Sequence, residues 1–302
     1  MKTPKYLSIL SLAVIGTLYG SSPAWADPLL GSDLATFAVL GATPDVTNVP
    51  PSTIVGNVGV SPAQAFSGFN FTAGASTSDS QVTGSVESNT ALAQSAQAQL
   101  LTARTNLSGL GIGTTLPSDL VGLTIYPGVY TVPFATTNLS GAVTLDGLGD
   151  PNAFWLFQTD ALTTASGSVV NVIDTGTGAG VGVFWNDTSS VTLGSSTSFQ
   201  GNILALTSIV LDSTATIGCG RALANNGDVT LIMNTIGIGC GSNGFSGSGL
   251  EFTGGNVVNT ETGNVVSVPG TFVTVPEVPE PATLALLGLG LAGLGLSRRR
   301  LS

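Results

Sequence analysis

The chain has 302 residues and a formal net charge of −10, and only 8% of its residues are charged, against about a quarter in an average soluble protein. Five of the seven basic residues lie at the two ends, so between Asp27 and Pro281 only Arg104 and Arg221 oppose the 17 acidic residues. This distribution excludes nucleic acid as a partner, because phosphate binding needs a basic surface. The lack of His excludes His-based catalysis and His-ligated zinc, and we expect no cofactor.

Residues 1–26 have the features of a secretory signal peptide. Lys2 and Lys5 precede an apolar run from Leu7 to Leu18, and the segment closes on the small-residue cleavage pattern Ala24-Trp25-Ala26. The alternative is a buried N-terminal helix, which the short run and the following Asp27-Pro28 disfavour.

A helical period is confined to the segment from Glu87 to Leu107. Its apolar positions recur at steps of three and four residues, at Leu92, Ala96, Leu100, Ala103 and Leu107. The sequence predicts a helix over about 88–107, with Ser88 as N-cap and Gly109 as the stop.

Short apolar segments separated by Gly, Ser, Thr and Asn fill the rest of the body, and three sets of them recur about every 19 residues. The first set is Val183–Asn186, Asn202–Thr207 and Arg221–Asn225; the second is Val191–Leu193, Ile209–Leu211 and Val229–Leu231; the third is Ser198–Phe199, Thr216–Ile217 and Thr235–Ile236. Three strands in each repeat of this length are typical of a β-solenoid with three faces, which we number 1, 2 and 3 after the sets.

Alternation along the strands predicts the role of each face. Face 1 is apolar on both sides and needs a cover, and the helix is the obvious cover. The outward positions are Thr192, Val210 and Thr230 on face 2 and Ser198, Thr216 and Thr235 on face 3. The predicted fold is mainly β, a three-faced (triangular) β-solenoid with one long α-helix packed along one face.

Cys219 and Cys240 lie in matched Gly-rich bulges one repeat apart. Export permits a disulfide between them, and two unpaired buried thiols are the alternative. Two Cys without any His do not make a metal site. The segment from Asp146 to Asp150 is shorter than a calcium-binding loop, which favours a turn in which the carboxylates accept hydrogen bonds from local backbone N–H groups.

Residues 276–302 form a tail in three parts: Pro279-Glu280-Pro281, an apolar run from Ala282 to Leu296, and the cluster Arg298 to Arg300. The tail resembles the PEP-CTERM sorting signal of exopolysaccharide-producing Gram-negative bacteria. The resemblance implies transient retention in the inner membrane and removal by an exosortase-type protease; a plain C-terminal membrane anchor is the alternative. We therefore expect a secreted or cell-surface protein that contacts the membrane only through its terminal segments, with a solenoid domain over residues 27–275.

Seven motifs, in order along the chain, resemble the secreted microbial ice-binding protein family. They are Asp33–Leu40, Gly56–Pro62, Gln81–Gly84, Leu123–Tyr130, Gly149–Phe154, Leu162–Gly167 and Gly201–Thr207. The resemblance covers about Leu30 to Thr235. It implies a discontinuous three-faced solenoid with a long flanking helix, and binding to the surface of ice crystals by adsorption.

The family's ice-contacting face carries a loose Thr-(Ala/Gly)-x-(Thr/Asn) pattern, which this chain matches imperfectly on face 3. The candidate ice-binding residues are Thr164, Ser166, Ser196, Ser198, Thr214, Thr216 and Thr235. Ser196 and Thr214 are expected to form a second row, two residues before Ser198 and Thr216. Face 2 is less suitable, because Val210 interrupts its row and Asp212 and Asp228 flank it.

Two other classes of function are compatible with parts of the sequence. A cell-surface adhesin or matrix protein could use the same face on exopolysaccharide and would need the same export signals. A solenoid polysaccharide lyase or hydrolase needs a base and basic neighbours, whereas Arg104 and Arg221 fall on the predicted helix and the covered face. We therefore expect no enzymatic activity and assign no catalytic residue.

Overall fold

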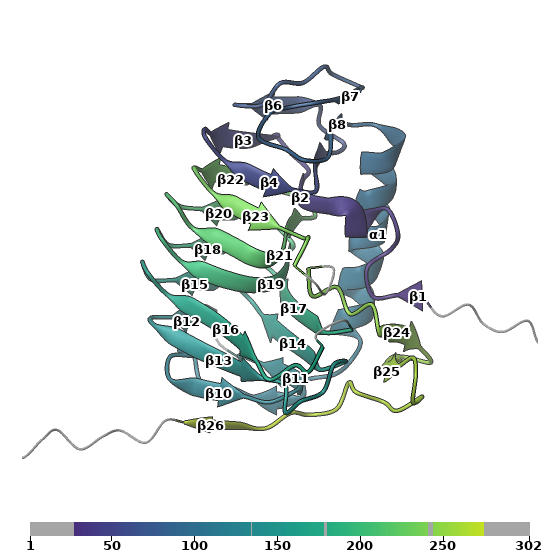
Figure 1. The fold of residues 1–302 in the computed structure, drawn as a ribbon, viewed down its shortest axis with the longest axis vertical. Helices are drawn as coiled ribbons and strands as arrows, with labels where there is room; N and C mark the ends of the chain where they lie inside the picture. The colour runs from purple at the N-terminus through teal and green to yellow at the C-terminus, as the bar shows by residue number, and fades with distance from the viewer. Residues whose placement is uncertain (1–26, 134, 178–179, 241–243, 275–302) are drawn as a thin grey trace, which may run out of the picture.

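The computed structural model describes residues 27–133, 135–177, 180–240 and 244–274. Its strands stack into coils, and the single α-helix of the described part, α1 (Ala91–Ser108), stands along one side of the stack (Figure 1). Each complete coil passes from face 2 to face 3, then to face 1, and returns to face 2. The prediction of a mainly β solenoid with a flanking helix is confirmed.

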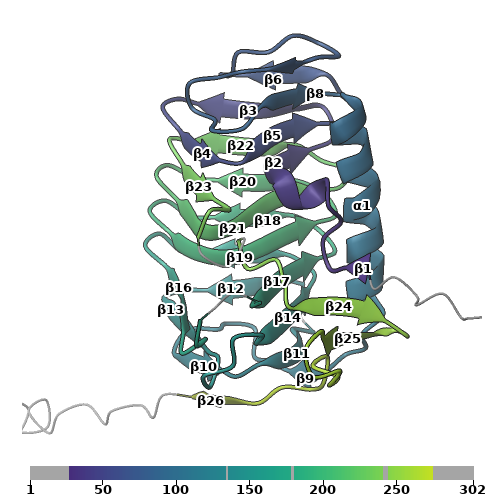
Figure 2. The ribbon, with the colours of Figure 1, turned by 45° about the vertical axis from the view of Figure 1, so that its right-hand side comes forward.

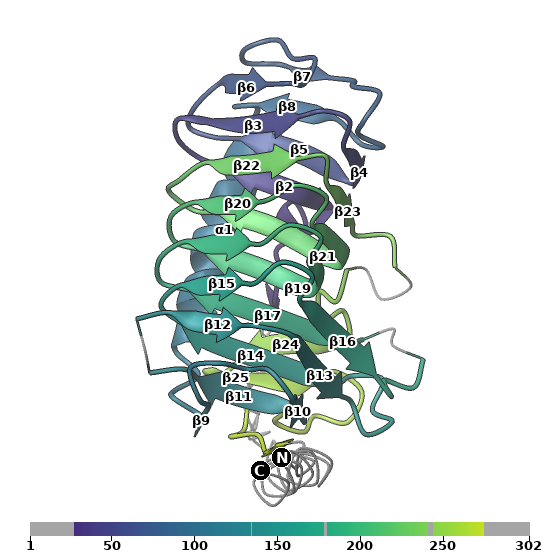
Figure 3. The ribbon, with the colours of Figure 1, turned by 90° about the vertical axis from the view of Figure 1, so that its left-hand side faces the viewer.

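Face 2 is a parallel sheet of seven short strands, which Figure 3 shows as a column with α1 behind it. Their spatial order is β12 (Thr137–Leu139), β15 (Leu162–Thr164), β18 (Val191–Leu193), β20 (Ile209–Leu211), β22 (Val229–Ile232), β3 (Asp45–Val49) and β6 (Ala65–Ser67).

Faces 3 and 1 belong to one sheet, because β19 (Ser198–Ala205) and β21 (Thr216–Ala224) run through the corner between them. Face 3 also contains β26 (Phe272–Thr274), β10 (Leu123–Ile125), β13 (Ala142–Asp146), β16 (Val169–Ile173), β23 (Thr235–Gly237) and β4 (Thr53–Val55). Face 1 also contains β9 (Thr114–Thr115), β11 (Gly128–Thr131), β14 (Phe154–Thr159), β17 (Gly182–Asp187), β2 (Phe37–Gly41), β5 (Asn57–Val60), β8 (Val86–Ser88) and β7 (Ser76–Thr77).

The stack is not continuous in sequence. The N-terminal segment, which enters through the short helix η1 (Leu34–Thr36), places β2, β3 and β4 directly beside β21, β22 and β23. α1 then carries the chain back along face 1 to β9 at the opposite end (Figure 2). The discontinuous order implied by the family resemblance is therefore present.

Alternation on face 1 divides its apolar side chains between two cores. One set points into the solenoid, where the Phe157 and Trp185 rings stack with centroids 4.0 Å apart. The other set, which includes Phe154, Leu156 and Phe184, points outward and packs in one cluster with the buried side of α1. The face is apolar on both sides because both sides are buried, as the sequence predicted.

The helix begins slightly later than predicted. Ser88 belongs to β8, and the N-cap is Thr90, whose hydroxyl accepts a hydrogen bond from the Ala93 N–H at 3.3 Å. Gly109 is the C-cap, as expected. The Gln97 side-chain amide donates to the carbonyls of Gly41 and Ala224 at 2.9 and 3.1 Å, and so fixes the helix to face 1 by hydrogen bonds as well as by apolar packing.

Residues 244–274 form an arm over the lower end of the stack, a segment to which the sequence assigned no role. Within it, β24 (Leu250–Thr253) pairs with β25 (Asn256–Asn259) and with β1 (Asp27–Pro28). At the end of the arm β26 pairs antiparallel with β10. The arm covers the exposed edge of the lowest face 3 strand, which would otherwise offer unpaired backbone groups.

The predicted signal peptide (1–26) and tail (276–302) lie outside the described residues. Among the residues that are described, no helix has the length and apolar character needed to cross a membrane.

Candidate functional site

A row of short side chains runs along face 3 on adjacent parallel strands. Ser198 pairs with Thr216, and Thr216 pairs with Thr235, so the three predicted residues of this row are in register. The row continues upward to Thr53 in β4 and downward to Val169 in β16. Its upper part thus presents one hydroxyl per strand over four neighbouring strands.

The sequence prediction missed Thr53. It lies in the N-terminal segment, on the far side of α1 in the sequence, and reaches the row only because β4 stacks on β23. A signal was available: the dipeptide Thr-Ile occurs at Thr53-Ile54, Thr216-Ile217 and Thr235-Ile236, with each Ile buried in the core.

The hydroxyl row lies on strands without acidic residues. The four strands that carry it, β4, β23, β21 and β19, contain no Asp or Glu. Thr53 and Thr235 are exposed, whereas Ser198 and Thr216 are half-buried, and the Thr216 hydroxyl donates weakly to the Thr197 carbonyl at 3.3 Å.

Ser196 and Thr214 do not form a second row on these strands, which corrects the prediction. Both residues lie at the corner between faces 2 and 3 with positive φ angles of 59° and 61°, and the residue after each is buried. The left-handed conformation interrupts the alternation of inward and outward side chains. The residues two positions before Ser198 and Thr216 therefore do not lie on face 3. The two hydroxyls still lie together, 2.9 Å apart.

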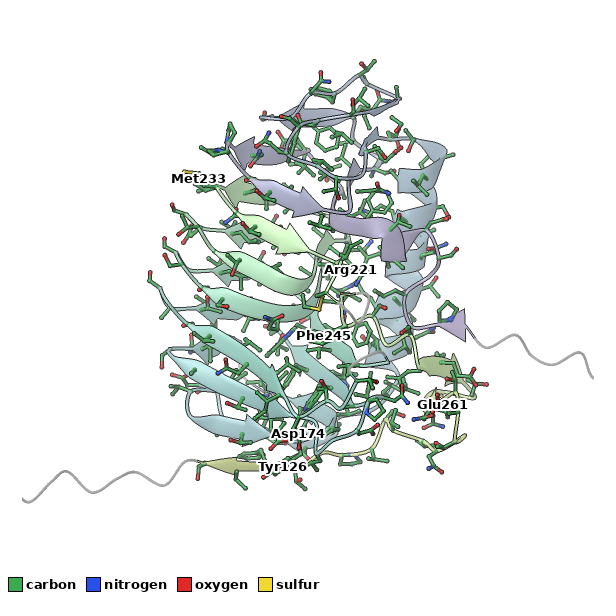
Figure 4. The ribbon with its side chains drawn as sticks, viewed as in Figure 1. Tyr126, Asp174, Arg221, Met233, Phe245 and Glu261 are labelled. Atoms are coloured by element: carbon green, nitrogen blue, oxygen red, sulfur yellow. A yellow bond between two sulfur atoms is a disulfide. The ribbon has the colours of Figure 1, made fainter. Side chains whose placement is uncertain are left out.

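In the coils above and below this hydroxyl pair, other residue types occupy the equivalent left-handed position at the corner. Gly167 takes the left-handed position in the coil below, and Met233, 40% exposed, takes it in the coil above (Figure 4). A left-handed conformation is strained for a β-branched residue, at about 1–3 kcal/mol, whereas Gly adopts it freely. Thr214 therefore occupies a position that the coil of Gly167, two coils lower, fills without strain.

Thr164 and Ser166 belong to the same corner one coil lower, and only Ser166 is exposed. The Thr164 hydroxyl is buried, 2.8 Å from the Thr197 hydroxyl, and accepts a hydrogen bond from the Gly194 N–H at 2.9 Å. This side chain braces the corner from within, so its assignment to an external ice-contacting row was wrong.

Face 2 carries a longer row than the sequence suggested. In register along it are Asn138, Thr163, Thr192, Val210, Thr230, Thr47 and Ser67. Two of its hydroxyls donate to carboxylates on the same face, Thr47 to Asp45 at 3.2 Å and Thr230 to Asp228 at 3.3 Å. Charged groups therefore lie directly beside this row.

Arg104 and Arg221 lie on the helix and on face 1, as predicted. Arg104 is 7% exposed, and burial lowers its pKa while the nearby Asp187 carboxylate opposes that change. Arg221 is 1% exposed and donates to Asn202, Gly244 and Ala35, and burial lowers its pKa to about 10. Both side chains join segments that are distant in sequence and neither is part of faces 2 or 3.

Burial also raises the pKa of Asp187 to about 7. The carboxyl group accepts a hydrogen bond from the Thr159 hydroxyl, and that bond and the Arg104 charge both lower the pKa without offsetting burial.

The acidic turn at Asp146 to Asp150 has the predicted form, since Asp146 and Asp150 accept from the backbone N–H groups of Leu148 and Asn152 at 3.0 and 2.8 Å. No cluster of three or more metal-ligating side chains occurs among the described residues.

Cys219 and Cys240 form a disulfide, with their Cα atoms 5.5 Å apart. The predicted pairing is confirmed, and the alternative of two free thiols is wrong.

Two family models match the chain. The model described as Ice-binding-like matches residues 40–237, and the model of the PEP-CTERM protein-sorting motif matches residues 277–300. An ice-binding protein of Nostoc sp. (strain HG1) is 40% identical over 238 residues, which are 78% of this chain and 83% of that protein. An ice-binding protein of Flavobacterium frigoris (strain PS1) is 32% identical over 67% of this chain and 73% of its own length.

Solved structures show the same fold. The crystal structure of an ice-binding protein from an Antarctic biological consortium has a TM-score of 0.60 at 30% identity, and covers 76% of this chain and 95% of that one. The DUF3494 domain of Shewanella frigidimarina ice-binding protein 1 has a TM-score of 0.59 at 26% identity, and covers 70% and 96%. With this fold, these relatives and a family model matching most of its length, the chain belongs to the ice-binding-like family.

Proposed function

We propose that the exported protein adsorbs to ice through face 3 and thereby inhibits ice growth or recrystallisation. One observation carries the choice of face: the row Ser198, Thr216, Thr235 and Thr53 lies on four adjacent parallel strands that contain no acidic residue. The relatives named as ice-binding proteins support ice as the ligand.

The physical basis is a fixed array that orders water. Parallel strands lie about 4.8 Å apart, so one outward Thr or Ser on each strand repeats its hydroxyl at that spacing. The Thr hydroxyl can hydrogen-bond an ordered water, its methyl group disfavours liquid-like hydration, and its stiff χ1 holds both in place. A carboxylate beside the row would instead retain its own hydration shell, which does not match a lattice.

The Ser196–Thr214 pair extends this surface around the corner. Its hydroxyls lie 2.9 Å apart at a position where Thr214 is strained and Gly167 is not. Strain retained at an exposed position is a reason to assign a function to the side chain there. We therefore include Ser196, Thr214 and the exposed Ser166 in the ice-contacting surface, together with Ser198, Thr216, Thr235 and Thr53.

Export follows from the two ends of the chain. Residues 1–26 act as the signal peptide, residues 27–275 form the solenoid domain, and residues 276–302 are held transiently in the inner membrane until an exosortase-type protease removes them. The PEP-CTERM match supports this route. The mature protein is then secreted or displayed at the cell surface and acts by adsorption without turnover.

Purified mature protein tests the proposal. We expect thermal hysteresis, faceting of ice crystals and inhibition of recrystallisation, whereas an inert globular protein at equal concentration produces none of them. A parallel binding assay with the exopolysaccharide of the producing cell tests the adhesin alternative. Binding to polysaccharide with no effect on ice would replace this proposal by the adhesin function.

A further inference from the structure

The regular coiling of the chain ends at β23. In the two coils below it, one strand passes from face 3 directly into face 1, as β19 and β21 do. β23 instead ends at Gly237, and the place beside β21 on face 1 is taken by β2 of the N-terminal segment, through Val39↔Ala222 and Leu40↔Leu223. β23 therefore has no face 1 continuation of its own.

The backbone ladder holds β23 over a short length only. It has two register pairs with β21, Thr216↔Thr235 and Ile217↔Ile236, and three with β4 on its other side. The ladder with β21 stops where that strand bulges before Cys219. A three-residue strand that does not continue into a longer one opens easily, because few hydrogen bonds must break together.

The disulfide lies at the place where this ladder stops. Cys219 follows the last paired residue of β21 by two positions and is 4% exposed, and Cys240 follows the end of β23 by three. We infer that the Cys219–Cys240 disulfide takes the place of the missing face 1 strand continuation, and is the positioning element that keeps β23 on face 3. It thereby holds Thr235 in the hydroxyl row and, through β4, also holds Thr53. The consequence for ice rests on the proposed function, whereas the consequence for strand opening does not.

The double variant Cys219→Ala/Cys240→Ala of the mature protein tests the inference by amide hydrogen exchange. Exchange in β23 and β4 should become faster by about tenfold or more, while β22, the face 2 strand of the same coil, keeps its wild-type rate. Ice-growth inhibition should fall at the same time. Wild-type exchange rates in β23 of the folded variant would overturn the inference.

Two further variants keep the test decisive. Val191→Ala in β18 truncates a buried side chain on face 2, two coils from β23, and should lower the melting temperature without selective opening of β23. Selective opening of β23 in that variant as well would show that the strand responds to general instability, which overturns the inference. If the double variant does not fold, Cys240→Ala alone retains the buried Cys219 side chain and takes its place.

The two readouts separate the inference from the proposed function. Lack of ice activity in the wild-type protein would defeat the proposed function, while the exchange measurement would still decide whether the disulfide holds β23. Selective opening of β23 with undiminished ice activity would show that Thr235 and Thr53 need no clamp in order to work, which overturns the positioning role.

Discussion

Faces 2 and 3 are formed by the same coils and carry rows of outward hydroxyls with equally regular register. By number of hydroxyl groups alone, face 2 has the longer row. The difference lies in the neighbours: Asp45 and Asp228 accept hydrogen bonds from Thr47 and Thr230 on face 2, whereas the row strands of face 3 from β19 to β4 have no acidic residue. A Thr row is thus not enough to identify a water-ordering surface, and the charge beside it must be considered as well.

The corner between these faces adds a second contrast. The strands that carry both rows pair in parallel, but the Ser196 and Thr214 positions between them are held in the left-handed conformation. The strained residues and the paired hydroxyl groups of Ser196 and Thr214 thus occur at the same place, the corner that borders face 3.

The largest effect is expected from Thr216→Tyr. A ring in the middle of the face 3 row should prevent close contact with a flat surface and abolish most ice-growth inhibition, as measured by thermal hysteresis. Thr192→Tyr, in the face 2 row one coil below Thr216, should leave activity near wild type. Both sites point outward and Tyr suits strands, so circular dichroism should show both variants folded. Loss of activity in Thr192→Tyr alone would reverse the assignment of the faces, and full activity in both would exclude this region altogether.

A smaller loss is expected from Thr53→Tyr, since Thr53 lies at the upper end of the row rather than at its centre. The matched control is Thr47→Tyr, which alters face 2 within the same N-terminal segment. Recrystallisation inhibition measured over a range of concentrations should shift for the first variant and not for the second. Equal behaviour of the two would mean that the ice-contacting row ends at Thr235.

Thr214→Gly should separate stability from activity. Relief of the left-handed strain, partly offset by the greater freedom of Gly in the unfolded chain, should raise the free energy of unfolding by about 0.5–1 kcal/mol. Loss of the Ser196–Thr214 hydroxyl pair should reduce ice activity moderately. Thermal melts and thermal hysteresis on the same sample check both signs, and a variant that is more stable and fully active would remove the corner from the ice-contacting surface.

The free energy of unfolding should depend on pH through Asp187, whereas ice binding at face 3 should not. Because burial raises the pKa of Asp187 from 3.8 to about 7, the folded protein holds this proton more tightly than the unfolded chain does. The stabilisation is complete below about pH 4 and is lost as the pH rises towards 7, by at most about 4 kcal/mol. Asp187→Asn should remove this slope in denaturation experiments at pH 5 and pH 8 while ice activity stays unchanged. An unaltered slope in the variant would assign the pH dependence to other groups.

Part of the candidate site could be predicted because it depends on local periodicity. Ser198, Thr216 and Thr235 each lie beside a residue buried in the core, at spacings of about one coil, so alternation alone aligned them. Ser196 and Thr214 were misplaced because they are themselves left-handed residues at the corner, where the strand alternation is interrupted, and neither residue type nor spacing indicates that conformation. Thr164 was misplaced for another reason: it belongs to β15 on face 2, in register with the inward-pointing Leu193.

The sequence by itself determined the repeat, the apolar character of both sides of face 1, the need for a covering helix and the matched positions of Cys219 and Cys240; the structure decided that the two thiols are bonded. Each of these follows from side-chain polarity or position within a repeat of about 19 residues. Only the tertiary structure decided that β4 stacks on β23, which brings Thr53 to the row, and that residues 244–274 cover the lower edge of the stack. These contacts join segments far apart in the chain, and they form because the open ends of a solenoid must be paired or covered, a requirement that local pattern cannot assign to a particular segment.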